Sequence, residues 1–287
     1  MLYKKYISNP IVIFQRGRDF ISEALIKSKL MKGDNQYQKY IILAWYRTGS
    51  NLIVNLLSSH PSIIAYSELF HPPEIFWGEG VFGLSQQQND QIIETRNKKT
   101  DLFLDKYVFR KYPAYIEAVG FKVLYPHFND KRYKGLKKIL LSSDDLKIIH
   151  LKRRDLLQVY VSKELAAKRR IMNETSSKRA YQNLLEIGKL YCPIENVESF
   201  FIDHSKRVKE YDDLLVSNKV LEVYYEDLVK NIQLGMKNVQ DYLCVKQKKL
   251  NTVLVKQNVL SLQEIIANFL ELSEYFKGTE WEFFFNR

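Results

Sequence analysis

Two segments of the chain carry side chains that suit the binding of phosphate or sulfonate groups. The first spans residues 47–50 with the sequence RTGS, which combines a forked cation, two hydroxyls and a glycine. An apolar run precedes it and an amphipathic run follows it, so we expect a strand, a tight turn and a helix N-terminus. Backbone N–H groups at a helix N-terminus attract anions, and Arg47 can hold a phosphate or sulfonate with two parallel hydrogen bonds. The alternative is an ordinary strand–helix turn in which Ser50 caps the helix.

The second segment, KRRD at residues 152–155, follows another predicted strand. Three adjacent cations repel one another unless an anion lies nearby, and the hydroxyl of Ser162 follows Arg154 by eight residues. An arginine and a hydroxyl on the next helix can clamp one phosphate from two sides, and each charge-assisted hydrogen bond contributes roughly 1.5–3 kcal/mol. The alternative is a solvated turn in which Asp155 and Glu164 pair with these cations.

Short apolar runs that alternate with helical patterns would position both segments. The predicted strands are residues 40–45, 62–66, 118–124, 146–151 and 219–225, and the predicted helices are residues 51–59, 176–191 and 194–217. This alternation is typical of an α/β fold with a mostly parallel central sheet flanked by helices. Ligands of such sheets bind at the carboxyl ends of the strands, and both anion-binding segments lie there.

The sequence also predicts how the chain is divided. Residues 1–36 form an N-terminal extension, in which the spacing of Phe20, Ala24 and Leu25 predicts a helix over residues 12–31. Residues 33–35, with the letters GDN, end this helix. We expect residues 37–287 to form a single domain.

Composition narrows the class of partner. The net charge of +11 suits nucleic acid, an anionic membrane surface or an anionic small molecule. The basic residues are scattered and form no long tail, so we expect no nucleic-acid partner.

Cys192 and Cys244 lack the spacing of a disulfide framework or a zinc site, which favours a reducing compartment. No apolar run is long enough for a membrane span, so we expect a cytoplasmic protein with at most peripheral membrane contact. Nothing in the pattern specifies an oligomeric state.

Together these segments resemble the sulfotransferases that use 3′-phosphoadenosine-5′-phosphosulfate (PAPS), most closely the bacterial nodulation-type and carbohydrate sulfotransferases. That family has a P-loop-like fold and a loop of the form R-[ST]-G-[ST]-x-L that holds the 5′-phosphosulfate. In this chain the loop reads Arg47-Thr48-Gly49-Ser50-Asn51-Leu52. The family binds the 3′-phosphate with an Arg at a strand end and a Ser eight residues later, which correspond here to Arg154 and Ser162.

Further motifs resemble the family in the same order along the chain. They are His60-Pro61 followed by Tyr66 to Phe70, Gly120-Phe121-Lys122, Tyr225-Glu226-Asp227-Leu228, Lys256-Gln257-Asn258, residues 265–270 and Gly278-Thr279-Glu280-Trp281. Two positions depart from the pattern: Ser67 replaces a common glycine, and Asn51 stands where threonine is common. The first departure affects how Glu68 is held, and the second replaces a hydroxyl contact to the donor by an amide contact.

The resemblance implies that a sulfonate group moves from PAPS to an acceptor hydroxyl on a carbohydrate or glycolipid. It implies that Glu68 is the catalytic base and that Arg47 neutralises charge on the sulfonate and the bridging oxygen. His71 is the alternative base, Lys122 approaches the acceptor or the sulfonate, and Lys256 closes over the nucleotide. We expect no metal, because a sulfonate carries less charge than a γ-phosphoryl group. The stretch from Pro72 to Pro113, with Phe76, Trp77, Phe82 and three glutamines at residues 86–88, is expected to line the acceptor pocket.

Two other classes of function remain open at this stage. A kinase or NTPase would also bind a nucleotide phosphate, but the Walker A pattern GxxxxGK[ST] is absent. A non-enzymatic basic protein that binds glycan or nucleic acid would show salt-dependent binding without turnover.

Overall fold

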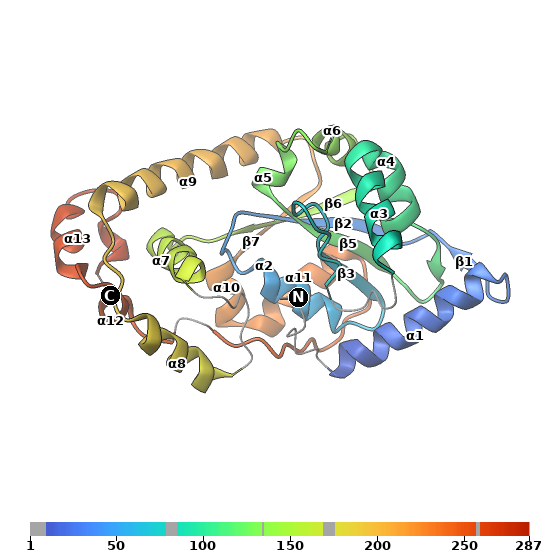
Figure 1. Ribbon diagram of the computed structural model, residues 1–287, viewed down its shortest axis with the longest axis horizontal. Coiled ribbons are helices and arrows are strands. Elements are labelled where there is room, and N and C mark those ends of the chain that lie inside the picture. The colour runs from blue at the N-terminus through green and yellow to red at the C-terminus, as the bar shows by residue number, and fades with distance from the viewer. Residues whose placement is uncertain (1–9, 79–84, 134, 169–175, 257–258, 287) are drawn as a thin grey trace. The chain divides into compact units, whose positions relative to one another are not determined.

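The computed structural model describes residues 10–78, 85–133, 135–168, 176–256 and 259–286 (Figure 1). The chain forms two compact units. The first comprises Met1–Lys152 and Ser217–Thr252, and the second comprises Arg153–Val216 and Val253–Arg287. Phe82, Gln257 and Asn258, which the sequence motifs include, lie outside the described residues.

A five-stranded sheet forms the centre of the first unit. Its strands are β2 (Gln38–Ala44), β3 (Ile63–Glu68), β5 (Ala118–Leu124), β6 (Leu146–Lys152) and β7 (Val220–Tyr224). Their spatial order is β3-β5-β2-β6-β7, and every neighbouring pair is parallel. All five predicted strands are therefore present, and the predicted α/β fold with a parallel central sheet is confirmed. A small antiparallel pair, β1 (Gly33–Asp34) with β4 (Tyr112–Pro113), was not predicted.

Helices cover the sheet because its strands are apolar on both faces. In the first unit they are α1 (Pro10–Lys27), α2 (Ser50–Ser58), α3 (Gln86–Lys98), α4 (Thr100–Phe103), η1 (Leu104–Val108), α5 (Tyr125–Phe128), α6 (Leu136–Leu141), α10 (Tyr225–Lys230) and α11 (Ile232–Leu243). One core joins Ile42 of β2 and Ile149 of β6 to α2, α10 and α11. Figure 1 shows α2 and α11 on one face of this sheet.

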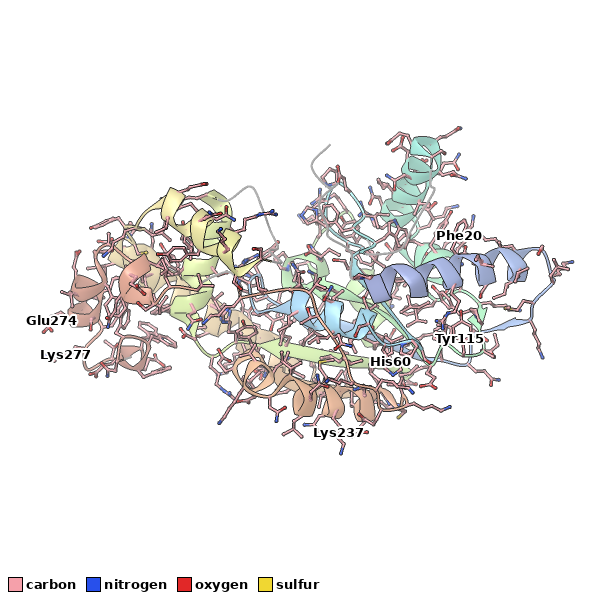
Figure 2. The ribbon with its side chains drawn as sticks, turned by 90° about the horizontal axis from the view of Figure 1, so that it is seen from below. Phe20, His60, Tyr115, Lys237, Glu274 and Lys277 are labelled. Carbon is pink, nitrogen blue, oxygen red and sulfur yellow. The ribbon has the colours of Figure 1, made fainter. Side chains whose placement is uncertain are left out.

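The N-terminal helix α1 is anchored to the first unit by polar contacts. The guanidinium of Arg18 lies 4.1 Å from the ring centre of Tyr115 and donates a hydrogen bond to the Pro61 carbonyl at 2.7 Å. Figure 2 shows Tyr115 beside this helix, while Phe20 of the helix is 54% exposed. The helix ends at Lys27 rather than at the predicted residue 31, since Lys29 already adopts a left-handed conformation (φ 62°).

The second unit is helical and has an aromatic core. Its helices are α7 (Leu156–Lys168), α8 (Ser177–Ile187), α9 (Ile194–Leu214), α12 (Leu262–Ile265), α13 (Phe269–Tyr275) and η2 (Glu282–Phe284). The rings of Phe201 and Phe276 lie 5.4 Å apart, and both rings contact Trp281. Helix α8 ends before the predicted residue 191 because Gly188, at φ 69°, leaves the helical conformation. Among the described residues, no helix is both long and apolar enough to cross a membrane.

Candidate active site

The predicted anion-binding loop connects β2 to α2 and has an unusual backbone. Arg47 adopts φ 63° and Gly49 adopts φ 93°, both in the left-handed region. An arginine in this region costs on the order of 1–3 kcal/mol, and such strain is found mostly at functional sites. Left-handed residues alternating with others can turn successive backbone N–H groups toward one point, which forms an anion-binding concavity. The loop thus has the backbone features of an anion site, directly before a nine-residue helix.

Gly49 is required here by a neighbour as well as by its backbone. A Cβ atom at this position would lie 2.3 Å and 2.7 Å from two ring carbons of Tyr225. Tyr225 is the first residue of α10, so the tyrosine of the YEDL motif packs directly on the loop. The contact brings the two motifs together at one place in the fold.

The other loop residues take different positions. The Thr48 side chain is buried, and its hydroxyl donates to the Trp45 carbonyl at 2.9 Å, so it stabilises the turn itself. Ser50 is the first residue of α2, and Gly49 rather than Ser50 is the N-cap. The Leu52 backbone N–H donates to the Gly49 carbonyl at 2.9 Å, and its side chain packs against the core.

A buried lysine connects this loop to the predicted base. The Lys122 ammonium lies 2.7 Å from Oε1 of Glu68 and also donates to Oδ1 of Asn51 in the first turn of α2. Lys122 is 1% exposed, and the Glu68 side chain is 18% exposed. Asn51, which replaces a common threonine, therefore accepts a hydrogen bond from a residue of this chain. The three side chains form one charged cluster, defined here as the Glu68–Lys122–Asn51 cluster.

An irregularity in β3 creates this pairing. Tyr66 lies opposite Phe121 of β5, yet Lys122, the next residue of β5, lies opposite Glu68. Ser67 is thus the extra residue of a β-bulge, and bulges re-aim side chains next to active sites. Without it, Ser67 would face Lys122 and Glu68 would move to the other side of the strand.

Charge and burial act in opposite directions on the predicted base. Burial raises the pKa of Glu68, but the Lys122 ammonium and its hydrogen bond outweigh burial, so the pKa is lowered overall. Glu68 is therefore ionised at neutral pH and able to accept a proton. The two groups stabilise the fold above the usual carboxyl pKa, and this contribution is lost as the pH falls through the lowered value.

Two histidines and Tyr46 lie close enough to this carboxylate to interact with its charge, and the Phe76 ring lies beside one of the histidines. Burial lowers the pKa of His71, and burial lowers the pKa of His127 to about 4, so both rings are neutral at pH 7. Their ring centres lie 6.3 Å apart, and the Phe76 ring lies 4.5 Å from that of His71. Burial and then the charge of Glu68 raise the pKa of Tyr46, which is 41% exposed.

The remaining predicted site residues belong to the second unit. Arg154 is exposed and precedes α7, whose N-terminus is capped by Asp155 through a hydrogen bond from the Gln158 backbone N–H at 3.0 Å. Asp155 thus caps a helix. Ser162 is 8% exposed and lies on the same helix, about 9 Å along its axis from the first residue, Leu156. Lys256 is exposed and lies in a segment without regular secondary structure.

Part of the predicted acceptor stretch is used for local structure. Gln88 and Ser85 form a reciprocal capping box at the start of α3, and Gln86 donates to Asp90 at 2.9 Å. Gln86 and Gln88 therefore stabilise a helix terminus. Phe76 and Trp77 instead pair with the end of β3, because the Phe76 N–H donates to the Glu68 carbonyl and the Ser67 N–H donates to the Trp77 carbonyl.

Two residues near the site were missed by the sequence analysis. His127 follows the third predicted strand, and its position at a strand end was a usable signal. Its Nδ1 accepts from the Leu124 N–H at 3.3 Å, so the neutral ring carries its proton on Nε2. Arg96 is a polar-helix residue that is only 1% exposed, and no sequence pattern distinguishes it from a solvated arginine.

The fold is an α/β fold, and the site combines a carboxylate with a candidate anion-binding loop where a parallel strand meets a helix. The profile of the Sulfotransferase family matches residues 40–248 of the chain. Nodulation protein H of Rhizobium tropici is 24% identical over 264 residues, which cover 86% of this chain and 93% of that relative. The chain therefore belongs to the sulfotransferase family, and it is a sulfotransferase enzyme.

Two solved structures are also similar at low identity. The sulfotransferase of Alicyclobacillus acidocaldarius is 17% identical with a TM-score of 0.44, over 83% of this chain and 90% of that one. The sulfotransferase domain of the olefin synthase of Synechococcus PCC 7002 is 19% identical with a TM-score of 0.44, over 84% and 86% of the two chains. The family assignment rests on the sequence profile.

Proposed function

We propose that this sulfotransferase transfers the sulfonate group of PAPS to a hydroxyl of a carbohydrate or glycolipid. The observation that carries the proposal is the Glu68–Lys122–Asn51 cluster. Lys122 contacts both the carboxylate at the end of β3 and the first turn of α2, so an ionised base lies next to the anion-binding loop. A base and an anion site in contact are what in-line transfer to a hydroxyl requires.

In the proposed reaction the acceptor oxygen attacks the sulfur atom of PAPS. Its proton passes to a carboxylate oxygen of Glu68, the new O–S bond forms, and the bond from sulfur to the 5′-phosphate oxygen breaks. The electron pair of that bond leaves on adenosine 3′,5′-bisphosphate (PAP). Arg47 and the backbone N–H groups of residues 48–51 neutralise the charge that develops on this oxygen. The scheme uses no metal, because these groups supply the positive charge.

Recognition of the 3′-phosphate is assigned to Arg154 and Ser162, on the resemblance of their spacing to the family motif. Arg154 forms charge-assisted hydrogen bonds to this phosphate, and the Ser162 hydroxyl adds one from an uncharged donor. Lys256 closes over the nucleotide. In this proposal residues 37–287 act as one sulfotransferase domain, and residues 1–36 are an extension to it. The cytoplasmic location stays a prediction from the spacing of the two cysteines.

The acceptor class is supported by the motifs that resemble carbohydrate sulfotransferases and by the side chains near Glu68. Tyr46 and Phe76 offer aromatic faces on which a sugar ring can pack, and His71 offers a neutral ring for a polar contact. Incubation with sulfur-35-labelled PAPS and a panel of oligosaccharides, glycolipids and small alcohols tests the proposal. Labelled carbohydrate is expected, whereas label on small alcohols alone would contradict the acceptor class.

Removal of the Lys122 ammonium is expected to move the pH dependence of turnover. In Lys122→Met, burial still raises the pKa of Glu68 but no cation opposes it, so the pKa rises. Glu68 acts as base only when ionised, and the pH at which kcat/KM rises should therefore move upward. Lys39→Met, which removes a half-buried strand lysine 3.7 Å from Asp145, is the matched control. A variant whose acid limb coincides with that of the parent would show that Lys122 does not set this pKa.

A further inference from the structure

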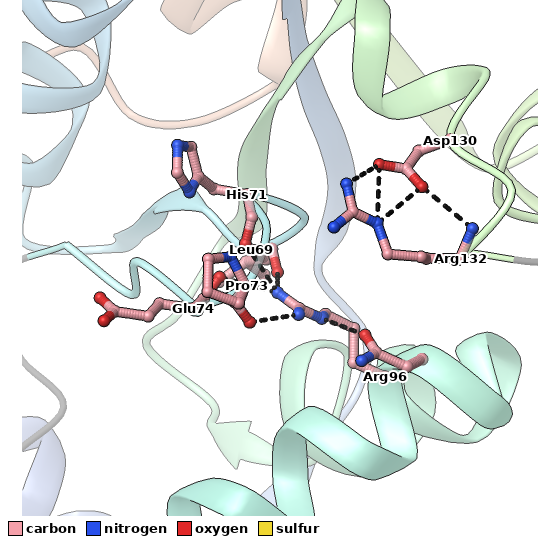
Figure 3. Close-up of polar contacts among 8 residues, drawn as sticks. Leu69, His71, Pro73, Glu74, Arg96, Asp130 and Arg132 are labelled. Atoms are coloured by element: carbon pink, nitrogen blue, oxygen red, sulfur yellow. Dashed lines mark hydrogen bonds and ion pairs between the residues drawn. The ribbon is translucent and has the colours of Figure 1, made fainter.

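A buried arginine holds the segment that follows the proposed base. Arg96 lies near the end of α3 and is 1% exposed. Its Nη1 donates to the carbonyl oxygens of Leu69 at 2.9 Å, His71 at 3.1 Å and Glu74 at 2.8 Å. Its Nη2 donates to the Pro73 carbonyl at 2.8 Å. Figure 3 shows these carbonyl groups turned toward one guanidinium, so residues 69–74, defined here as the post-base loop, fold around Arg96.

The remaining surfaces of this guanidinium are also occupied. Nε donates to Oδ1 of Asn97 at 3.0 Å, and the Tyr133 ring centre lies 5.0 Å from the guanidinium carbon. Among the described residues, no carboxylate forms an ion pair with Arg96, so backbone dipoles and an aromatic face stabilise its charge. Burying a cation without a carboxylate is costly, and truncating it would leave four backbone carbonyls without their donor. The loop conformation therefore depends on this one side chain.

Hydrogen bonds tie the post-base loop, and Phe76 just after it, to Glu68. The Glu68 carbonyl accepts hydrogen bonds from the His71 N–H at 3.4 Å and from the Phe76 N–H at 3.1 Å. The loop also carries His71, whose ring lies beside Phe76. A change in the path of residues 69–74 would consequently displace the Glu68 backbone and the His71 ring together.

We propose that Arg96 is a positioning residue that fixes the post-base loop and thereby aims Glu68 and His71 at the acceptor hydroxyl. This inference rests on the proposed role of Glu68 and adds a residue outside the family motifs. Arg96 itself touches neither substrate nor donor in this proposal. Its removal should consequently affect proton transfer and acceptor use, and should leave binding of the nucleotide unchanged.

Two variants test this role against a matched control. Arg96→Lys keeps the positive charge, but an ammonium lacks the planar, forked guanidinium that donates to four carbonyls at once. Arg96→Ala removes the donor altogether. Arg132→Lys is the control, because Arg132 lies 6.0 Å from the same Tyr133 ring but is exposed and paired with Asp130. Because a 1 Å misplacement can cost about 10²-fold, we expect both Arg96 variants to lose about 10²-fold in acceptor kcat/KM, with PAP affinity and the control near parent values.

Hydrogen–deuterium exchange of the backbone amides of residues 69–76 supplies a measurement that does not depend on sulfonate transfer. In the parent these amides should exchange far more slowly than in an unstructured peptide. In Arg96→Lys they should exchange faster than in the parent, while the amides of β5 stay protected.

Parent-like turnover in a folded Arg96 variant would overturn the proposal, as would equal losses of PAP affinity and turnover. If neither variant folds, unprotected exchange of this loop in the parent overturns it, and protected exchange supports it. Failure of the parent to bind PAP would instead contradict the proposed function and leave the loop result standing.

Discussion

Glu68→Gln is expected to reduce turnover by about 10²–10⁴-fold, the usual contribution of a general base, while PAP binds as in the parent. The glutamine keeps the size of the side chain and can still accept a hydrogen bond from Lys122, but it cannot take the acceptor proton. The loss should therefore appear in kcat and kcat/KM for the acceptor. Steady-state kinetics and calorimetric titration with PAP measure the two quantities separately.

Glu74→Gln is the matched control for this substitution. Glu74 lies in the post-base loop that follows Glu68, and its contact with Arg96 is made by the backbone carbonyl, so its carboxylate is dispensable to that contact. His71→Gln tests whether His71, rather than Glu68, is the general base. Parent-like turnover in Glu68→Gln together with a large loss in His71→Gln would transfer the role of base to His71 and refute the assignment of Glu68.

Arg154→Ala is expected to weaken PAP binding by about 10–150-fold, which corresponds to the 1.5–3 kcal/mol of a charge-assisted hydrogen bond. Its effect should be confined to the 3′-phosphate, so AMP, which lacks that group, should bind parent and variant equally. Ser162→Ala should weaken PAP binding less, because a neutral hydroxyl contributes less than a guanidinium. Calorimetric titration with the two nucleotides gives all of these affinities.

Arg153→Ala serves as the control because the Arg153 guanidinium donates to Oε1 of Gln158 at 2.7 Å, a contact within the same helix terminus. It removes the same charge one residue away. If Arg154→Ala binds PAP as tightly as the parent, the assignment of the 3′-phosphate to Arg154 is wrong. If Arg153→Ala shows the larger loss, the second cation of the segment binds the phosphate instead.

The parallel sheet was predictable from local sequence, because fully buried strands appear as short apolar runs and each ends close to a motif. The run at residues 40–45, followed by RTGS, specified a strand, a glycine turn and a helix, and β2, Gly49 and α2 occur there. The family motifs also indicated which residues to examine at the strand ends. Each of these signals lies within a short stretch of the sequence, so it can be recognised without information on contacts between distant residues.

The contacts that complete the site were not predictable in the same way. The bulge at Ser67 shifts the alternation of β3 by one residue, and only the pairing with β5 reveals it. The resemblance implies that Lys122 approaches the acceptor or the sulfonate, but it did not reveal that the Lys122 ammonium contacts Glu68 and Asn51. Arg96 and Tyr225 act on residues that are distant in the sequence, so their roles depend on tertiary packing.

The most direct test of the donor is the ratio of the affinities of the parent protein for PAP and AMP, measured by calorimetric titration. The two ligands differ only in the 3′-phosphate, and two contacts of 1.5–3 kcal/mol each predict that PAP binds about 10²–10⁴-fold more tightly. Equal affinity for PAP and AMP, or a preference for ATP with Mg²⁺, would contradict the use of PAPS.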